Sequence, residues 1–173
     1  MNKQYAIAFF EIAKEDNTLA SCKESFDVFV KVLENEKDLA LVLNSPKIKT
    51  NDKKDLIKNT FEHCSLDFIY FINVVLDNGR IDKIKDIYNE FLHLYNEENN
   101  IKVVSVISAT ALSKDEQNKL LNSLKSNYQG YEIILNNKID PSVVGGYHIL
   151  VNGLSIDLSV KRKIENLSNH LAN

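Results

Sequence analysis

The sequence predicts a mostly α-helical protein, with an N-terminal six-helix bundle over residues 1–100 and a small α+β unit (β-α-β-β-α) over residues 101–173. Two observations lead to this fold class. The first 100 residues contain one proline, Pro46, and one glycine, Gly79, so little interrupts helical periodicity there. After the polar stretch "NEENN" at residues 96–100, valine and isoleucine become frequent, which is typical of strands.

The first expected helix spans Tyr5–Leu19. At 100° per residue, Tyr5, Ala8, Phe9 and Ile12 share one face. Further apolar residues widen this face beyond what one core contact requires: Ala6, Phe10 and Ala13. The helix is therefore expected either to be deeply buried or to keep one side for a partner.

The next helices are separated by local stop and start signals. Apolar residues at helical spacing predict helices over Cys22–Leu33 and Lys37–Asn44. Pro46 marks the break that follows, because proline lacks a backbone donor and disfavours helix in the residue before it. Asn51 or Asp52 is expected to cap the fourth helix.

The run Phe68–Leu76 is apolar except for Asn73. Its Ile, Val, Phe and Tyr residues favour a strand by propensity alone. Because its neighbours are helical, we expect a helix that is buried on most sides. Asn78-Gly79 should end it, since glycine adopts the left-handed conformation at little cost. Isoleucine and aromatic residues then continue at helical spacing from Ile81 to about Asn96.

The second unit begins after a polar boundary at residues 96–100. Ser113 should cap its first helix in a capping box with Glu116, three residues later. Asn152-Gly153 is a turn signal, and Ser155 or Asp157 is expected to begin the final helix. The expected strands are Ile101–Ala109, Tyr131–Leu135 and Val143–Val151, the last followed by a short extension over Leu154–Ile156.

Composition and charge narrow the functional classes. The chain is 44% hydrophobic and 26% charged, with a net charge of −3, which argues against nucleic acid as the main partner. Residues 1–100 carry 13 basic and 18 acidic side chains, and residues 101–173 carry 8 and 6, so the two parts are suited to different partners. No apolar run approaches 18 residues, so we expect no direct membrane insertion. Cys22 and Cys64 form no CxxC motif and are expected to be reduced structural thiols.

The usual motifs of catalysis are missing. Gly145-Gly146 is followed by "YHIL", which lacks the lysine and the serine or threonine of a P-loop. The two glycines also do not form the GxGxxG motif that begins a helix in dinucleotide-binding folds. Asp140 and Asp157 are interpreted as a turn former and a helix cap. The four histidines are scattered, and His63 beside Cys64 has no second ligand pair. We therefore expect no catalytic residue, no cofactor and no metal.

Four segments, taken in order, carry a family pattern: "YAIAFFEIAKE" at residues 5–15, "LDNGRIDKIKDIYNEFLHLYNEE" at 76–98, "VVSVISATALSKDEQNKL" at 103–120 and "KIDPSVVGGYHILVNGLSIDLSVKRKIENL" at 138–167. Together they resemble one family, the delta subunit of F-type ATP synthases, which is the equivalent of the oligomycin-sensitivity-conferring protein. The chain departs from the family pattern at Phe9, which makes the first helix face bulkier.

The resemblance implies a non-catalytic stator subunit. Such a subunit links the alpha subunits of the catalytic head to the b-type peripheral stalk and resists rotor torque during proton-driven ATP synthesis. The bundle over residues 1–100 would bind the head, and residues 101–173 would bind the stalk. The chain would act as a monomer within a hetero-oligomer, peripheral to the membrane on the cytoplasmic face of a bacterial cell.

The resemblance also implies a contact site for the N-terminal helices of the alpha subunits, on the first and fifth helices. For Phe9 and Val74, burial within the bundle is the alternative. Two other readings of the whole chain are a helical adaptor unrelated to ATP synthase and a small enzyme that uses the Gly145-Gly146 loop. The residues carried over are Tyr5, Ala8, Phe9, Ile12, Val74, Asp77 and Asn78.

Overall fold

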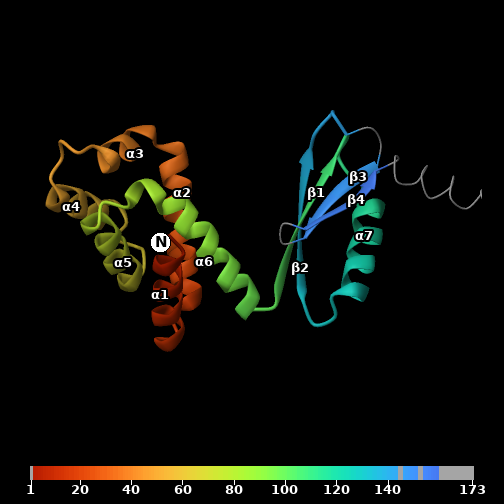
Figure 1. The fold of residues 1–173 in the computed structure, drawn as a ribbon, viewed down its shortest axis with the longest axis horizontal. Helices are drawn as coiled ribbons and strands as arrows, with labels where there is room; N and C mark the ends of the chain where they lie inside the picture. The colour runs from red at the N-terminus through yellow and green to blue at the C-terminus, as the bar shows by residue number, and fades with distance from the viewer. Residues whose placement is uncertain (1, 144–145, 152–153, 160–173) are drawn as a thin grey trace, which may run out of the picture. The chain divides into compact units, whose positions relative to one another are not determined.

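The computed structural model describes residues 2–143, 146–151 and 154–159. The chain folds into two compact units, Met1–Tyr95 and Asn96–Asn173 (Figure 1). The chain is mostly helical, with one small mixed sheet. Each unit contains its own buried apolar cluster. Each unit is described separately below.

The first unit is built from helices joined by short turns. Their bounds are α1 (Asn2–Glu15), α2 (Leu19–Asn35), α3 (Lys37–Asn44), α4 (Thr50–Thr60), α5 (Leu66–Asp77), the 3₁₀ turn η1 (Ile81–Lys83) and α6 (Ile84–Glu98).

Phenylalanines form the centre of this unit. The ring of Phe26 in α2 lies 5.2 Å from that of Phe68 in α5 and 5.6 Å from that of Phe91 in α6, between ring centroids. The ring of Phe9 lies 6.1 Å from Phe26 and meets it edge to face. Such tilted contacts add to the hydrophobic gain from burial. The core therefore fixes α1 and α5 against a shared aromatic centre.

Several helix boundaries differ from the sequence expectation, and α1 and α2 both begin three residues earlier than expected, at Asn2 and Leu19. α1 ends at Glu15 and not at Leu19, because Asn17 adopts a left-handed conformation with φ of 56° that a helix cannot continue. α4 begins at Thr50 with Lys49 as its extended N-cap, so neither Asn51 nor Asp52 caps it. Asp52 lies in the first turn instead, where its charge complements the helix dipole.

The helix expected around Phe68–Leu76 is confirmed as α5. The Ser65 side chain caps its start by accepting the backbone N–H of Phe68. At its end Gly79 has φ of 62°, its N–H donates to the Leu76 carbonyl, and the N–H of Arg80 donates to that of Val75. This pattern is a Schellman motif, as Asn78-Gly79 led us to expect. Both ends of α5 are thus encoded locally.

The second unit contains a four-stranded sheet in the order β2-β1-β3-β4. β1 runs parallel to β2 and antiparallel to β3, which is antiparallel to β4. Figure 1 shows α7 along one face of the sheet, where its leucines pack on Val104, Val106, Ile149 and Val151. The elements are β1 (Ile101–Ser108), α7 (Lys114–Asn127), β2 (Glu132–Ile139), β3 (Gly146–Val151) and β4 (Leu154–Ser159).

The expectation for the end of this sheet is right for the strand extension over Leu154–Ile156, which lies in β4, and wrong for the start of the final helix. Leu154–Ser159 forms a fourth strand, and Asp157 lies opposite His148 in its ladder, so neither Ser155 nor Asp157 begins a helix. The expected third strand also starts later than Val143. The backbone N–H of Val143 donates to the Asp140 carbonyl in a turn, and β3 begins at Gly146. The expected final helix, the phosphate-loop candidate Gly145 and the Asn152-Gly153 turn lie outside the described residues.

Candidate protein-binding groove

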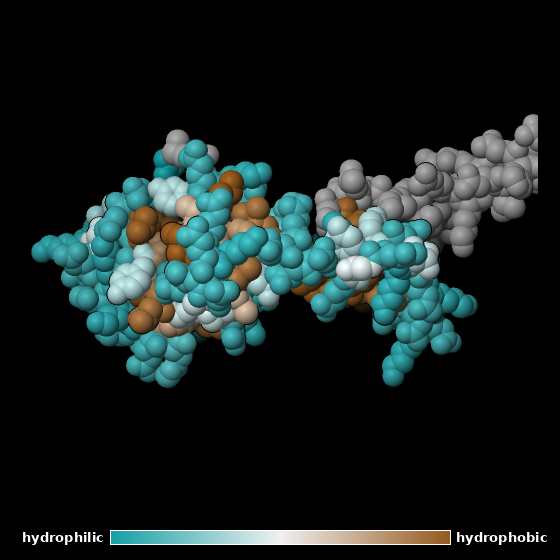
Figure 2. Space-filling model, turned by 90° about the horizontal axis from the view of Figure 1, so that it is seen from below, coloured by the Kyte–Doolittle hydropathy of each residue, from teal (hydrophilic) through white to brown (hydrophobic). Residues whose placement is uncertain are grey.

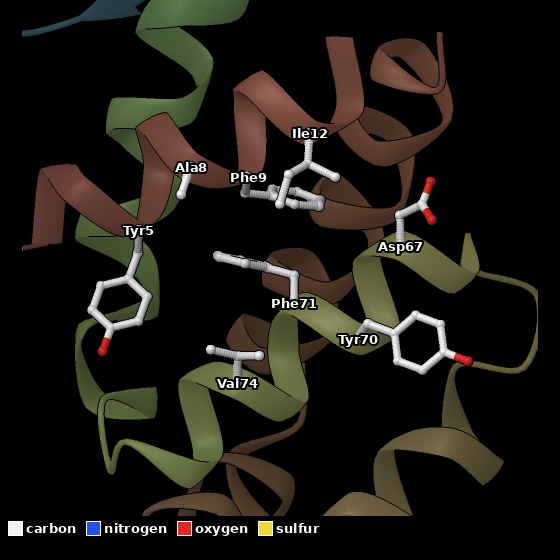
Figure 3. A pocket seen from close by; sticks show the side chains of 8 residues that line it. All are labelled: Tyr5, Ala8, Phe9, Ile12, Asp67, Tyr70, Phe71 and Val74. Carbon is white, nitrogen blue, oxygen red and sulfur yellow. The ribbon is translucent and has the colours of Figure 1, made fainter. Parts of the chain in front are cut away.

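An apolar groove of about 270 Å³ lies between α1 and α5 (Figure 3). α1 contributes residues of its expected wide apolar face, and α5 contributes the side that its core residues leave open. Apolar side chains are also visible at the surface of this unit among polar ones (Figure 2). The groove is lined by Tyr5, Ala8, Phe9, Ile12, Asp67, Tyr70, Phe71 and Val74.

Two stacked rings form the floor of the groove. The ring centroids of Phe9 and Phe71 lie 4.2 Å apart with an interplanar angle of 11° (Figure 3). Phe9 is only 2% exposed, and it also contacts Phe26 and Phe91 in the core. The floor is therefore continuous with the hydrophobic core and held rigidly by it.

The walls of the groove expose apolar surface to solvent. The exposed fractions are 52% for Ile12, 67% for Tyr70 and 49% for Val74. Tyr5 is half-buried and stands at one end, whereas Asp67 and Tyr70 stand at the other (Figure 3). Large apolar side chains that converge on a hollow, unlike scattered ones, are typical of a surface that another molecule covers.

Five of the seven expected contact residues line this groove: Tyr5, Ala8, Phe9, Ile12 and Val74. The other two do not. Asp77 is paired with Lys54 at 2.6 Å, and the side-chain amide of Asn78 donates to the Val74 carbonyl at 2.8 Å and so helps to end α5. For Phe9 the burial alternative holds, because its ring belongs to the core. Val74, in contrast, is half-exposed.

Sequence reasoning missed three lining residues, Asp67, Tyr70 and Phe71. A signal was present, since Tyr70 and Val74 lie four residues apart on one helix face. The expectation that α5 is buried on most sides concealed it. Phe68, Ile72, Val75 and Leu76 are buried, but the opposite side of the helix is open.

A larger hollow of about 530 Å³ lies on the other side of α5, against α4. Charged side chains line it, including Lys54, Asp55 and Lys58. One polar atom in its lining, the Asn73 side-chain oxygen, is buried without a hydrogen-bond partner. The α1–α5 groove is the stronger candidate for an apolar helix, because its lining contains a single charged side chain.

The aspartate and cysteine residues considered above as candidates for catalysis have structural roles instead. The Asp140 carboxylate accepts the Ser142 N–H at 2.9 Å, which is the expected turn, and this contact lowers the pKa of Asp140. Cys22 and Cys64 are free thiols, and burial raises the pKa of both. Across residues 2–143, 146–151 and 154–159 we find no His, Cys, Asp and Glu cluster suited to a metal ion. Within the same ranges, the helices are too short or too polar to span a membrane.

The family model for the ATP synthase delta (OSCP) subunit matches residues 1–171. The chain belongs to this family. Its members are structural rather than catalytic subunits of a complex that couples ATP synthesis to proton transport, so the chain is a non-catalytic, delta-type ATP synthase subunit.

Relatives from distant organisms agree with this assignment. The ATP synthase subunit delta of Ehrlichia chaffeensis is 33% identical over 94% of this chain and 86% of its own length. The chloroplastic delta subunit of Galdieria sulphuraria is 35% identical over 95% and 93%. A chain from the Toxoplasma gondii mitochondrial ATP synthase hexamer matches all of this chain and 98% of its own length, with a TM-score of 0.82 at 18% identity, which shows a shared fold.

Proposed function

We propose that the α1–α5 groove binds the N-terminal helix of an ATP synthase alpha subunit. The observation that carries this proposal is the groove itself, whose aromatic floor and exposed apolar walls suit the apolar face of an amphipathic helix. The proposed contact surface continues past Val74 to Asp77, the last residue of α5, and Asn78, its C-cap. Tyr5, Ala8, Phe9 and Ile12 form the opposite side of the groove.

We further propose that residues 101–173 bind the b-type peripheral stalk, while residues 1–100 bind the catalytic head. The separate buried clusters of the two units support this division, because each proposed binding surface then belongs to a unit with a hydrophobic core of its own. The chain would act as one copy within the hetero-oligomeric complex, on the cytoplasmic face of a bacterial membrane. Its mechanical role would be to stop the head from turning with the rotor.

Titration with a synthetic alpha-subunit N-terminal peptide tests the groove assignment. Tyr5→Ala and Val74→Asp should each weaken binding by about 1–3 kcal/mol, a typical loss for an interface anchor. Val74→Asp should have the larger effect, because it places a charge against the apolar floor.

Val28→Asp is the matched control. Val28 lies on α2, is 45% exposed and does not line the groove. Its substitution should therefore leave the peptide affinity unchanged. If folded Val74→Asp protein binds the peptide as tightly as the wild type does, the groove is not the site.

A further inference from the structure

Asp67 is the only acidic or basic side chain in the groove lining. It lies in the first turn of α5, beside Ile12 at one end of the groove (Figure 3). The Thr18 hydroxyl donates to one of its carboxylate oxygens at 2.8 Å. Because that donor is neutral, the contact orients the carboxylate without cancelling its charge.

The two ends of the groove differ in charge. Beyond Val74, the carboxylate of Asp77 is neutralised by the ammonium group of Lys54 at 2.6 Å. At the other end stands the carboxylate of Asp67, beside Ile12 (Figure 3). The groove is thus apolar along its length and negative at the Ile12–Asp67 end.

We propose that Asp67 selects a basic amphipathic helix and sets its direction in the groove, by pairing with one lysine or arginine of the partner. This inference rests on the proposed function of the groove. The α1 wall runs from Tyr5 to Ile12, seven residues or about 10 Å of helix axis. The basic residue therefore lies about two turns along the partner from the apolar residue that contacts Tyr5.

Asp67→Asn isolates the charge. The amide oxygen still accepts the Thr18 hydroxyl, so the local fold is retained while the negative charge is removed. We expect the full-length variant to remain folded with a slightly lower unfolding temperature, because Asp67 lies in the first turn of α5, and to bind the alpha-subunit N-terminal peptide about three- to tenfold more weakly. The salt dependence of the affinity should also fall, which a purely structural role of Asp67 would not cause.

The partner residue is identified with peptides in which each lysine or arginine is replaced singly by glutamine. One of these replacements should weaken binding to the wild type by a similar factor and have no further effect on Asp67→Asn. Asp55→Asn is the matched control, because Asp55 lines the hollow on the other side of α5. This control should bind every peptide as the wild type does.

Each possible failure has a distinct signature. If the peptide binds and Val74→Asp weakens it, but no basic position couples to Asp67, the groove assignment stands and the role of Asp67 is wrong. If the wild type does not bind the peptide, or Val74→Asp binds it normally, both proposals are overturned. Dimerisation of the free chain that Val74→Asp abolishes would show that a second copy occupies the groove, which also overturns both.

Discussion

Phe9 and Tyr70 illustrate two kinds of residue at the same groove. Phe9 is 2% exposed and its ring meets four other phenylalanine rings, so its main contribution is to the stability of the core. Tyr70 is 67% exposed and its ring stands at the groove wall. Lining a pocket therefore does not by itself make a residue an interface anchor.

Phe9→Ala should lower the free energy of unfolding by about 3–5 kcal/mol, because it leaves a cavity among rings that cannot fully collapse. Urea denaturation measures this loss. Tyr70→Ala should change stability by less than about 0.5 kcal/mol, as expected for an exposed position, yet it should weaken peptide binding. Equal loss of stability in the two variants would contradict this separation.

Helical spacing places Tyr5, Ala8 and Ile12 on one face of α1, and all three line the groove, whereas their role as contact residues is implied by the family resemblance. The sequence could not assign Phe9 to the floor rather than the wall, since both positions are apolar. Asp67 was missed for a different reason. Asp67 lies at the groove because of the way α5 packs against α1. The residues next to Asp67 in the sequence do not predict that packing.

At the scale of elements, α5 shows how context overrides propensity. Ile, Val, Phe and Tyr favour strands on their own, yet the segment is helical because its helix has a side-chain cap, a Schellman end and a buried face. β4 shows the opposite error. "LSIDLS" alternates strictly between apolar and polar residues, a strand pattern that the cap chemistry of Ser and Asp concealed.

The capping box of α7 is confirmed and gives a prediction about pH. The hydroxyl of Ser113 donates to Glu116 at 2.7 Å, and its backbone N–H donates at 2.9 Å. These bonds lower the pKa of Glu116 from 4.5. Because the folded-state pKa is the lower one, the stabilisation is present above pH 4.5 and is lost as the pH falls through that folded-state value.

Ser113→Ala should destabilise α7 by about 1 kcal/mol at pH 7, the usual cost of losing an N-cap side chain. Glu116→Gln should reduce the loss of stability between pH 5 and pH 3, as followed by thermal unfolding in a series of buffers. Ser126→Ala, near the other end of the helix, is a suitable control at pH 7. An unchanged pH profile in Glu116→Gln would show that the carboxylate does not contribute through the cap.

At the scale of the whole molecule, the two buried clusters predict that the parts can be separated. Truncation after Asn100 should leave a folded helical unit, because the first cluster is formed entirely by residues that precede it. Circular dichroism should show cooperative unfolding. The fragment should bind the alpha-subunit peptide with wild-type affinity and should not bind the b-type stalk. Retained stalk binding would show that the proposed division of labour is wrong.

The two walls of the groove become available at different times during translation. Its two walls come from Tyr5–Ile12 and Asp67–Val74, so the first wall leaves the ribosome long before the second exists. A nascent chain that ends before α5 exposes the apolar face of α1 without the phenylalanine that stacks on Phe9. Binding of the proposed partner would therefore have to wait until α5 has emerged, and the exposed apolar face of α1 favours aggregation during that interval.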